Sequence, residues 1–413
     1  MKLLTAFTYA SAFLTLTSAD APINNANVDS SLVIPGRYIV KYKDGTSASA
    51  KTTHENTINI QSTKSKKKGI ITKLTLPNLD GYVVDLDPSD LKQLQSSTII
   101  DYLEKDTIVN ATDLFHDSPP KARRANTIQR HVPWNLGRIS HKSWMLGSSD
   151  YIYDTSAGNN VRVYVIGSGV LTTHVEFEGR ATHGKNFIPN SPDTDEMGHG
   201  TCVASIVAGK TLGVAKRAQI ISVKALDKNG SGTITGAIQA ISWAVNDSVA
   251  KGIAKKSVIA MTMGGGYSAA LNAAVLSATN AGLTFVSGAG SSNYDAKYES
   301  PASAPTSFTV GAIDGMDRRT SWSNFGTSVD IFAPGISILT ANIGSPSNSA
   351  TRYMTGTAMA MPHVAGLAAY LIAKENLSGQ VAVTNRIITL SLKNMVGDAK
   401  GSNNRISYNG SGA

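Results

Sequence analysis

Cysteine, charge and aromatic side chains are scarce in this chain. Cys202 is the only cysteine among 413 residues, which excludes an intrachain disulfide and leaves the core, aided at most by a bound ion, to stabilise the fold. Only 16% of the residues are charged and 7% are aromatic, and the net charge of +9 is spread thinly, with its densest run at 64–69. This pattern lacks a basic face interleaved with aromatic residues, so we expect no nucleic-acid partner. The length suits about two domains.

Long apolar runs are also missing, except at the N-terminus. The stretch "MKLLTAFTYASAFLTLTSA" has one cation at Lys2, an apolar run and small residues ending at Ala19. This pattern predicts a signal peptide over 1–19, cut after Ala19, rather than a buried first helix. No later run is long enough to span a bilayer, so we expect a secreted, extracellular protein without a membrane span.

Five Asn-x-Ser/Thr sequons agree with passage through a secretory pathway, where N-linked glycans are attached at such sites. We therefore expect a glycoprotein. The candidate asparagines are Asn110, Asn229, Asn246, Asn376 and Asn409.

Residues 35–110 alternate strand and helix patterns in the order β-α-β-β-α-β, which predicts a ferredoxin-like α+β unit. The segments are "RYIVKYK", a polar helix around 47–62, "IITKLTL", "GYVVDL", a helix from Pro88 and "IIDYLEKDTIV". A polar linker beginning at Asn110, "NATDLFHDSPPKARRANTIQR", contains the basic run that ends at Arg124. We expect a Golgi processing protease to cut after Arg124.

Beyond Arg124, apolar strands alternate with Ala-rich helical stretches at 235–250, 268–280 and 358–374. The strands are "VRVYVIG", "AQIISVKAL", "SVIAMTMG", "LTFVSGAG", "SFTVGAI" and "VDIFAPG". This alternation predicts a mostly parallel sheet flanked by helices. Functional sites in such folds form beyond the carboxyl ends of the strands and at helix N-termini.

Four segments carry a family resemblance: "RVYVIGSGVLTTHVEFEGRA", "GHGTCVASIVAG", "VSGAGSSNYDAKYESPASAP" and "TGTAMAMPHVAGLAAYL". In order and spacing they resemble the blocks of the subtilases, and most closely the fungal proteinase K-like branch. The resemblance runs from about Pro133 to the C-terminus, and the first domain resembles that family's inhibitory propeptide. It implies a subtilisin-like domain over 125–413, preceded by a propeptide over 20–124.

The resemblance also implies an Asp-His-Ser triad and an oxyanion-hole asparagine. An imidazole activates the serine, a carboxylate orients the imidazole, and an amide stabilises the negative oxygen of the intermediate. Here His199 is retained, but Gly167 stands at the aspartate position, Ser291 at the asparagine position and Ala358 at the serine position.

Loss of the nucleophile alone costs roughly 10⁶ in turnover in a related subtilase. We therefore predict a catalytically inactive homologue; the alternative is a serine endopeptidase with a rescued or rewired site. Thr357, Ser291 or a Cys202–His199 pair could supply such a rescue, although Cys202 is better read as a buried apolar residue. A further alternative uses His199 as a general base on a non-peptide substrate.

Other acidic and histidine side chains receive a structural interpretation. Asp193 and Asp195 precede His199, and we expect them on a solvated loop rather than orienting the imidazole. Two histidines and two glutamates in "HVEFEGRATHG" have the residue types of metal ligands, but the family pattern holds most of these letters structurally. They are His174, Glu176, Glu178 and His183.

The resemblance implies a retained peptide-binding cleft. Two glycine-rich stretches match the strands that clasp a peptide by β-addition, and a third matches the wall of the primary specificity pocket. The residues are Gly230, Ser231, Gly232, Met263, Gly264, Gly265, Ser287, Gly288, Ala289 and Gly290. Asp330 and the carbonyl at Pro301 match a calcium site, so a structural calcium is expected at most and no cofactor is required. The expected partners are the chain's own propeptide and a peptide or protein in the cleft, and we expect a monomer.

Overall fold

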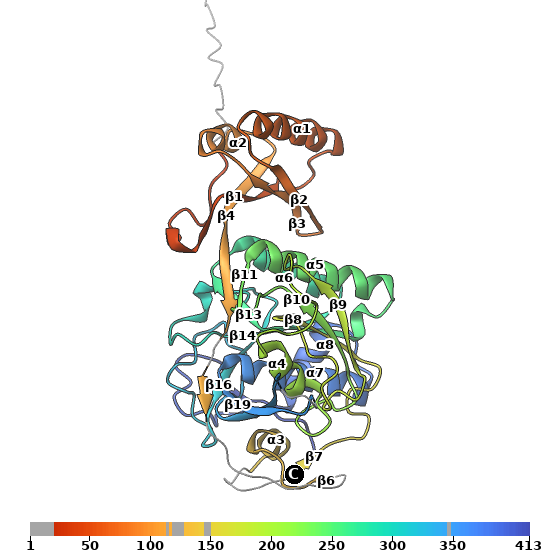
Figure 1. Cartoon of the computed structure of the whole chain (residues 1–413). Helices are drawn as coiled ribbons and strands as arrows, with labels where there is room; N and C mark the ends of the chain where they lie inside the picture. The colour runs from red at the N-terminus through yellow and green to blue at the C-terminus, as the bar shows by residue number, and fades with distance from the viewer. Residues whose placement is uncertain (1–19, 113–114, 118–127, 144–149, 345–347) are drawn as a thin grey trace, which may run out of the picture.

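The computed structural model describes residues 20–112, 115–117, 128–143, 150–344 and 348–413. A smaller N-terminal domain stands on a larger domain, and one long strand passes from the first into the second (Figure 1). The predicted cuts after Ala19 and Arg124 lie outside the described residues. Within the described residues, every helix is too short or too polar to cross a bilayer.

The N-terminal domain is the expected ferredoxin-like unit. Its four strands form an antiparallel sheet in the order β4-β1-β3-β2, with helices α1 and α2 on one side (Figure 1). The elements are β1 (Val33–Tyr42), α1 (Ala48–Lys64), β2 (Gly69–Leu76), β3 (Leu79–Asp85), α2 (Leu91–Gln95) and β4 (Ile100–Ala111), with 3₁₀ turns η1 (Ser30–Leu32) and η2 (Pro88–Asp90).

The large domain is built on a nine-stranded sheet in the order β20-β21-β17-β16-β14-β12-β8-β10-β9. All of its pairs are parallel except the terminal pair β20-β21, so the predicted mostly parallel α/β fold is confirmed. The strands are β8 (Arg162–Gly167), β9 (Ala181–Asn186), β10 (Gln219–Lys224), β12 (Ser257–Met261), β14 (Thr284–Gly288), β16 (Phe308–Ile313), β17 (Ile331–Pro334), β20 (Leu392–Lys393) and β21 (Arg405–Ile406).

Helices cover both faces of this sheet. The remaining elements are α3 (Trp134–Ser140), α4 (His199–Ala208), α5 (Ile234–Ala250), α6 (Ala269–Asn280), α7 (Thr357–Glu375), α8 (Gln380–Leu390), the short strands β5 (Phe115–Asp117), β6 (Ile128–Gln129), β7 (Tyr151–Ile152), β11 (Ser231–Thr233), β13 (Met263–Gly266), β15 (Glu299–Ser300), β18 (Ile338–Ala341) and β19 (Thr351–Thr355), and 3₁₀ turns η3 (Ala254–Lys256) and η4 (Ala296–Tyr298). The short strand β9 escaped prediction because its letters, "ATHGKN", contain no apolar run.

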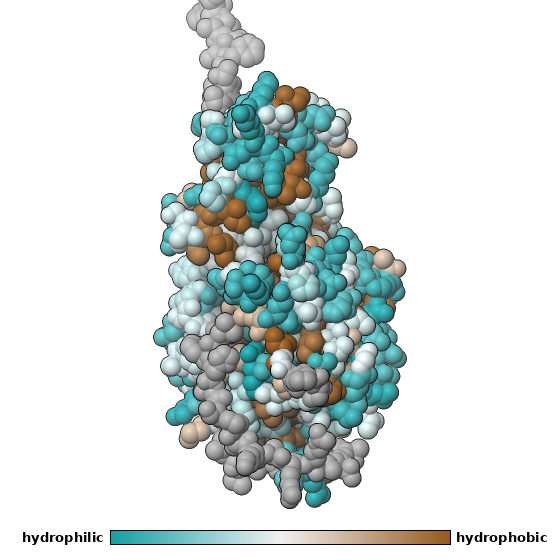
Figure 2. Space-filling model, viewed as in Figure 1, coloured by the Kyte–Doolittle hydropathy of each residue, from teal (hydrophilic) through white to brown (hydrophobic). Residues whose placement is uncertain are grey.

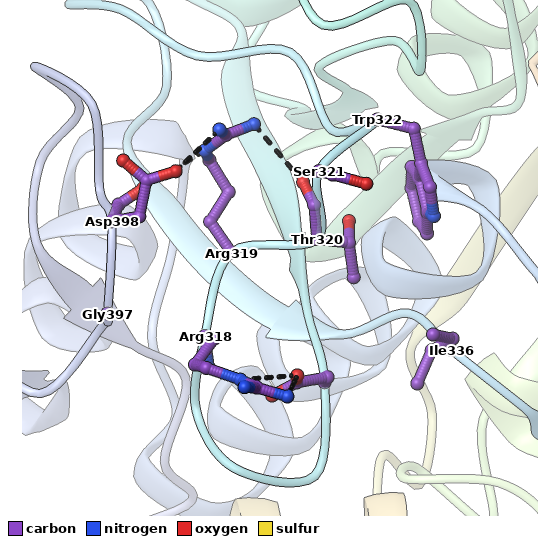
Figure 3. Close-up of a pocket in the computed structure, with 9 residues that line it drawn as sticks. Arg318, Arg319, Thr320, Ser321, Trp322, Ile336, Gly397 and Asp398 are labelled. Carbon is purple, nitrogen blue, oxygen red and sulfur yellow. Dashed lines mark hydrogen bonds and ion pairs between the residues drawn. The ribbon is translucent and has the colours of Figure 1, made fainter.

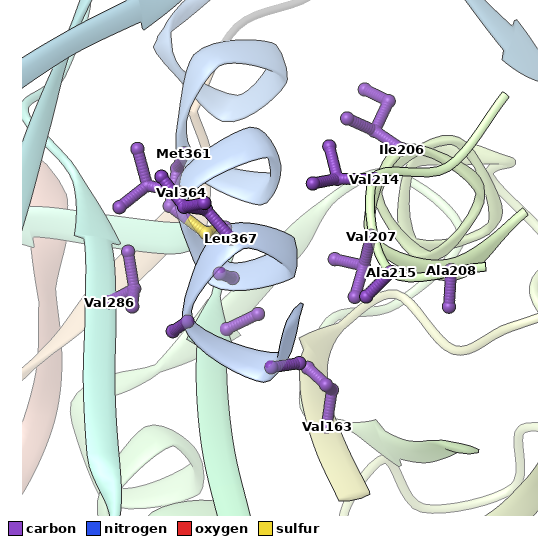
Figure 4. Packing of buried hydrophobic residues seen from close by; sticks show 14 of the residues in the cluster. Val163, Ile206, Val207, Ala208, Val214, Ala215, Val286, Met361, Val364 and Leu367 are labelled. Carbon is purple, nitrogen blue, oxygen red and sulfur yellow. The ribbon is translucent and has the colours of Figure 1, made fainter. Parts of the chain in front are cut away.

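Alternate residues of each central strand feed two different cores. Val163 and Val165 of β8 face the core that contains α4 and α7 (Figure 4), whereas Tyr164 and Ile166 face the core that contains α5 and α6. This follows from the period of two in strand side chains. The strand therefore ends at Gly167 between two packed layers, which fixes the position of that residue.

The two domains share a hydrophobic core. Ile39 and Val83 of the N-terminal sheet belong to the same buried cluster as Ile238 of α5 and Leu271 of α6. Figure 2 shows apolar side chains gathered close to the level at which the domains meet. Because burial of apolar surface is the main favourable term in association, the N-terminal domain is docked firmly on α5 and α6.

Candidate functional site

A groove in the large domain is filled by the last residues of the N-terminal domain. The end of β4 pairs antiparallel with β11 on one side and with β13 on the other, so it is the middle strand of three (Figure 1). The aligned pairs are Ser231 with Asn110, Gly232 with Val109, Met263 with Ala111, and Gly264 with Asn110. This is the geometry of β-addition, in which backbone groups hold the guest strand.

The glycines of the groove permit this close approach. A Cβ added to Gly232 would stand 2.3 Å from the carbonyl oxygen of Ala225, and one on Gly265 would stand 3.2 Å from Val109 of the guest strand. Gly230 has a φ of 79°, a conformation that side-chain-bearing residues rarely adopt. The groove therefore requires glycine for two separate reasons, close packing and turn geometry.

The guest strand continues toward His199. The backbone N–H of Thr112 donates to the carbonyl of Thr262 at 3.2 Å, and its hydroxyl lies 3.3 Å from the same oxygen. Phe115, His116 and Asp117 then form β5, which pairs antiparallel with β19 just before α7. The expected polar linker is thus wrong for 110–112 and 115–117, because these residues find backbone partners in distant strands.

Two buried carboxylates of β4 bind the N-termini of the helices beneath it. Glu104 accepts hydrogen bonds from the backbone N–H groups of Ala269 and Ala270, at 2.7 and 3.2 Å, where α6 begins. Asp106 accepts from the N–H and the hydroxyl of Thr235 in the first turn of α5. Burial raises the pKa of both carboxyls, and the helix donors oppose that rise. Sequence reasoning missed this pair, although acidic residues at inward positions of a strand are a usable signal.

His199 begins α4 and is completely buried. Neither ring nitrogen has a hydrogen-bond partner among the described residues. Burial lowers the pKa of His199 to about 4, and nearby Asp195 favours the cation without reversing that effect. The backbone of Thr112 also favours the cation slightly, but it lies outside hydrogen-bond geometry. The imidazole is therefore neutral at neutral pH, and among the described residues no carboxylate is hydrogen-bonded to it.

The place of the aspartate is closed. Gly167 ends β8, and a Cβ at this position would stand only 2.4 Å from Oγ1 of Thr262. That hydroxyl donates to the carbonyl of Ile166 at 3.1 Å. A carboxylate at position 167 would consequently require Thr262 to move. Nothing in the sequence pattern marks Thr262 as part of the site, so this contact could not be predicted from the sequence.

The nearby carboxylate of Asp195 caps the N-terminus of α4. Asp195 is 4% exposed and accepts hydrogen bonds from the N–H groups of Gly198 and Thr201, both at 2.8 Å. Ser168 donates to the same carboxylate at 2.8 Å. The expectation that Asp195 lies on a solvated loop is therefore wrong, because the helix N-terminus draws it inward; Asp193 is exposed.

Ser291 contacts Thr357, the residue before Ala358, at the start of α7. The hydroxyl of Ser291 lies 3.2 Å from Oγ1 of Thr357 and accepts from the Thr357 N–H at 3.3 Å. Ala358 is completely buried and presents a methyl group. Thr357 Oγ1 in turn accepts from the N–H of Gly290 at 3.2 Å. The hydroxyls of Ser291 and Thr357 are thus engaged with each other and with the turn.

The wall residues surround this turn. Ala289 is buried, Ser287 shares a hydrogen bond of 2.7 Å with Ser307, and a Cβ on Gly288 would stand 3.2 Å from Thr357 Oγ1. Gly290 has a φ of 94°. The segment therefore lies directly against the first turn of α7.

Cys202 does not pair with His199. Its thiol donates to the carbonyl of Ala341 at 3.2 Å, and Nε of Arg352 donates to its sulfur at 3.2 Å. Burial raises the pKa of Cys202, which disfavours the thiolate that nucleophilic attack requires. Cys202 is a buried packing residue, as the simpler interpretation held.

The suggested metal ligands have structural partners instead. His174 lies 2.9 Å from the carbonyl oxygen of Ala350, and Glu176 accepts from the N–H groups of Thr211 and Leu212. Across the residues that the structure describes, no three His, Cys, Asp or Glu side chains form a metal-binding group.

A surface pocket lies away from these residues and has no unpaired charge in view (Figure 3). Arg318 pairs with Asp314 at 2.8 Å, and Arg319 pairs with Asp398 at 2.8 Å. Trp322 and Ile336 line the opposite side (Figure 3). Since both arginines are already neutralised by carboxylates, the pocket offers little to bind a charged ligand.

Comparison with known proteins agrees with this architecture. A model described as "Subtilase family" matches residues 158–408, and one described as "Peptidase inhibitor I9" matches residues 37–112. The chain belongs to the subtilase family. The inhibitor match ends at Thr112, the residue that lies beside His199 in the groove.

Relatives are fungal subtilases. The chain is 45% identical to subtilisin-like protease 2 of Pseudogymnoascus destructans over 346 residues, covering 84% of this chain and 82% of that protein. It is 40% identical to alkaline protease 1 of Aspergillus clavatus over 391 residues, covering 92% and 93%. A solved cold-adapted subtilisin-like serine proteinase matches with a TM-score of 0.63 at 37% identity, covering 67% of this chain and 98% of that one.

Proposed function

We propose that this subtilase is a secreted, catalytically inactive homologue that holds a peptide strand in its cleft without cutting it. The observation that carries the proposal is the buried methyl of Ala358 at the place of the nucleophile. Gly167 and Ser291 support it, because the first leaves His199 without a carboxylate and the second replaces an amide with a short hydroxyl already engaged by Thr357.

The groove supports the binding part of the proposal. The pairings of β4 with β11 and β13 supply backbone hydrogen bonds on both sides of a guest strand. These pairings do not depend on the side chains of the triad. A chain that lacks the triad can therefore keep its affinity for an extended peptide.

The test has two readouts, each compared with the His199→Ala variant: intact mass of the purified full chain, whose own strand fills the groove, and hydrolysis of a broad peptide library after the N-terminal domain has been removed by an added protease. Equal background from both proteins is expected. Hydrolysis that disappears in His199→Ala would establish a serine endopeptidase with a rewired site. Turnover of a non-peptide ester that depends on His199, without proteolysis, would instead indicate a general base on another substrate.

Export and glycosylation form part of the same proposal. Asn110, Asn229, Asn246 and Asn376 are exposed, whereas Asn409 is buried and its side-chain N–H donates to the carbonyl of Ile152 at 2.7 Å. A glycan on Asn409 would displace that contact. Mass analysis of the secreted chain before and after glycosidase treatment should therefore find glycans at the four exposed sequons and none at Asn409.

The last part of the proposal is a structural calcium ion bound at Asp330. The carboxylate accepts from the N–H of Thr309 at 2.8 Å, and the Thr309 hydroxyl donates to the carbonyl of Ala302, next to Pro301. Burial raises the pKa of Asp330 to about 6, so the carboxylate is held in a place that disfavours its charge. A hard cation bound by this carboxylate and neighbouring carbonyls would relieve that cost.

The calcium test compares unfolding of the wild type and Asp330→Asn with and without calcium. We expect calcium to raise the unfolding midpoint of the wild type only. An equal rise in both proteins would place the cation elsewhere. Asp330→Glu provides a second variant that keeps the charge but changes its reach.

A further inference from the structure

Two glycine-rich segments continue the groove beyond the guest strand. The first is β13, which lies between the guest strand and β15. The second is the segment 287–290, which begins in β14 beside β12, where Met261 and Ser287 are paired. Backbone rather than side chains therefore lines the space between the two segments, and a Cβ added to Gly266 would meet nothing within 4 Å.

Glu299 connects these two segments. Its backbone is paired with Gly266 of the first segment. Its side chain reaches the second, because a Cβ added to Gly290 would stand 2.0 Å from Oε2 of Glu299. The side chain is only partly buried. Glu299 therefore crosses from one segment to the other and places a carboxylate at the end of the space between them.

A neutral donor holds this carboxylate in place. The hydroxyl of Tyr294 donates to Oε1 of Glu299. Burial and the bond to the Glu299 carboxylate raise the pKa of Tyr294, so the phenol keeps its proton and remains a donor. A carboxylate offers about four acceptor positions, and the phenol uses one of them. The site therefore presents a fixed negative group without a built-in cation from Tyr294.

Thr112 of the guest strand lies at the entrance to this space. Its N–H donates at 3.2 Å to the carbonyl of Thr262, the residue directly before β13. Continuing the register of β12 and β14 by one residue sets Thr262 level with Gly288 of the second segment. The side chain of Thr112 is short and ends near the entrance, with its hydroxyl 3.3 Å from the Thr262 carbonyl oxygen.

We propose that Glu299 selects a lysine or arginine at the guest position that Thr112 fills in this chain. The inference rests on the proposed function, binding of a peptide strand without cleavage, and names the chemistry of that peptide. Lysine and arginine combine an apolar stem, which suits glycine-lined walls, with a charged end that donates strongly to a carboxylate. Thr112 offers no cation, so the chain's own strand is not the best match to its groove.

The experiment changes the guest residue in the full chain, in which the groove is filled. Thr112→Lys, Thr112→Met and Thr112→Glu remove the sequon at Asn110 equally, so they are compared with one another. Hydrogen exchange of the 108–111 amides reports how often the strand leaves the groove. We expect exchange about tenfold slower in Thr112→Lys than in Thr112→Met, and fastest in Thr112→Glu. Equal exchange in the lysine and methionine variants would overturn the proposal.

Glu299→Gln tests whether the carboxylate is the cause. The amide keeps the size of the side chain and an acceptor for Tyr294 but removes the charge. Combined with Glu299→Gln, the lysine and methionine variants should differ by less than about twofold. A difference that stays near tenfold would place the preference elsewhere and would overturn the role of Glu299.

Asn110→Lys is the matched control for general charge attraction, since Asn110 is an exposed position of the same strand. We expect no slowing of exchange in this variant. Slowing as large as that in Thr112→Lys would show that any added cation holds the strand, and it would contradict a site at Glu299. This control does not depend on how well Glu299→Gln folds.

Intact mass of every variant separates this proposal from the proposed inactivity. A large fragment that begins at Asp113 would refute inactivity, and the ratio of cutting rates between Thr112→Lys and Thr112→Met would then decide the preference. An uncut chain with equal exchange in those two variants would leave inactivity standing and reject only the role of Glu299.

Discussion

The groove and the triad positions lie next to each other, but the sequence retains the expected groove residues and replaces most of the expected triad residues. In the groove, Gly232 and Gly264 accept a guest strand with regular pairing on both sides. At the triad, only His199 of the expected groups is present, and Thr262 stands where a carboxylate at position 167 would need room. Thr262 belongs to both regions, because its carbonyl binds Thr112 and its hydroxyl closes the aspartate position.

Under the proposed inactivity, peptide binding and peptide cleavage are separable in the subtilase fold. Peptide binding depends on backbone hydrogen-bonding groups and on the space that the glycines leave for the guest strand. Substitutions that spare the glycines therefore preserve it. Cleavage depends on a few functional atoms, and loss of the nucleophilic hydroxyl alone lowers turnover by roughly 10⁶ in a related subtilase.

The largest effect should come from rebuilding the triad region. Gly167→Asp, Thr262→Ala, Ser291→Asn and Ala358→Ser together should raise peptide hydrolysis by about four to six orders of magnitude over background. The rebuilt enzyme should also cut its own chain after Thr112, giving a mature N-terminus at Asp113. Fluorogenic peptide assays and intact mass report the two results.

Two controls sharpen that prediction. Adding His199→Ala to the rebuilt enzyme should return hydrolysis to background. Leaving Thr262 unchanged should give a protein that is inactive or poorly folded, because the new Cβ at 167 would lie 2.4 Å from Oγ1. Equal activity with and without Thr262→Ala would contradict the view that Thr262 closes the aspartate position.

The next effect concerns the docking of the N-terminal domain. Glu104→Ala and Asp106→Ala each leave buried helix N–H groups unpaired, which should cost about 1 to 3 kcal/mol of unfolding free energy apiece. Asp101→Ala in the same strand is the matched control, since its exposed pair with Lys41 should be worth less than about 1 kcal/mol. Denaturant titration measures all three, and equal losses would argue against helix capping.

Two buried histidines, His199 and His363, should both lower the stability of the fold in acid. Burial lowers the pKa of both His199 and His363 to about 4, so the unfolded chain takes up protons first as the pH falls below about 6.5. Each histidine should therefore lower the free energy of unfolding as the pH falls from 6.5 to 4, by about 3 kcal/mol per histidine over that interval. His199→Leu and His363→Leu should each remove that pH dependence in denaturant titrations.

At neutral pH the same two variants should diverge. His363 is paired with Asn135 at 2.7 Å and with the carbonyl of Met359 at 2.8 Å, whereas His199 has no partner in the described part of the chain. His363→Leu should lose about 1 to 2 kcal/mol, and His199→Leu should lose little or gain. A loss in His199→Leu as large as that in His363→Leu would indicate an unrecognised partner.

The smallest effect tests the groove itself. Gly265→Val would press on Val109 of the guest strand, where the added Cβ lies 3.2 Å from Cγ1, while Gly266→Val meets nothing within 4 Å. We expect Gly265→Val to loosen the strand by about 1 to 2 kcal/mol and Gly266→Val to leave it unchanged. Hydrogen exchange of the 108–111 amides reads this directly, and identical exchange in both variants would refute the contact.

Much of the architecture could be predicted from local pattern. Strand alternation and helical stretches predicted the ferredoxin-like unit and the parallel sheet, because periodicity follows from which face is buried. The hairpin β18–β19 and the short edge strand β9 could not be found this way, since their letters lack a sustained period. The polar letters from Asn110 predicted a linker, and only partners in β11, β13 and β19 make part of it a strand.

By itself, the sequence determined the family and the fold class, because these depend on residue identity and order. Only the tertiary structure decided that Asp195 caps α4, that Thr262 fills the room beside Gly167, and that residues 108–111 and 115–117 pair with strands of the large domain. Each of those facts joins residues far apart in the chain. Such contacts are set by packing and backbone hydrogen bonding between elements, and no local pattern encodes them.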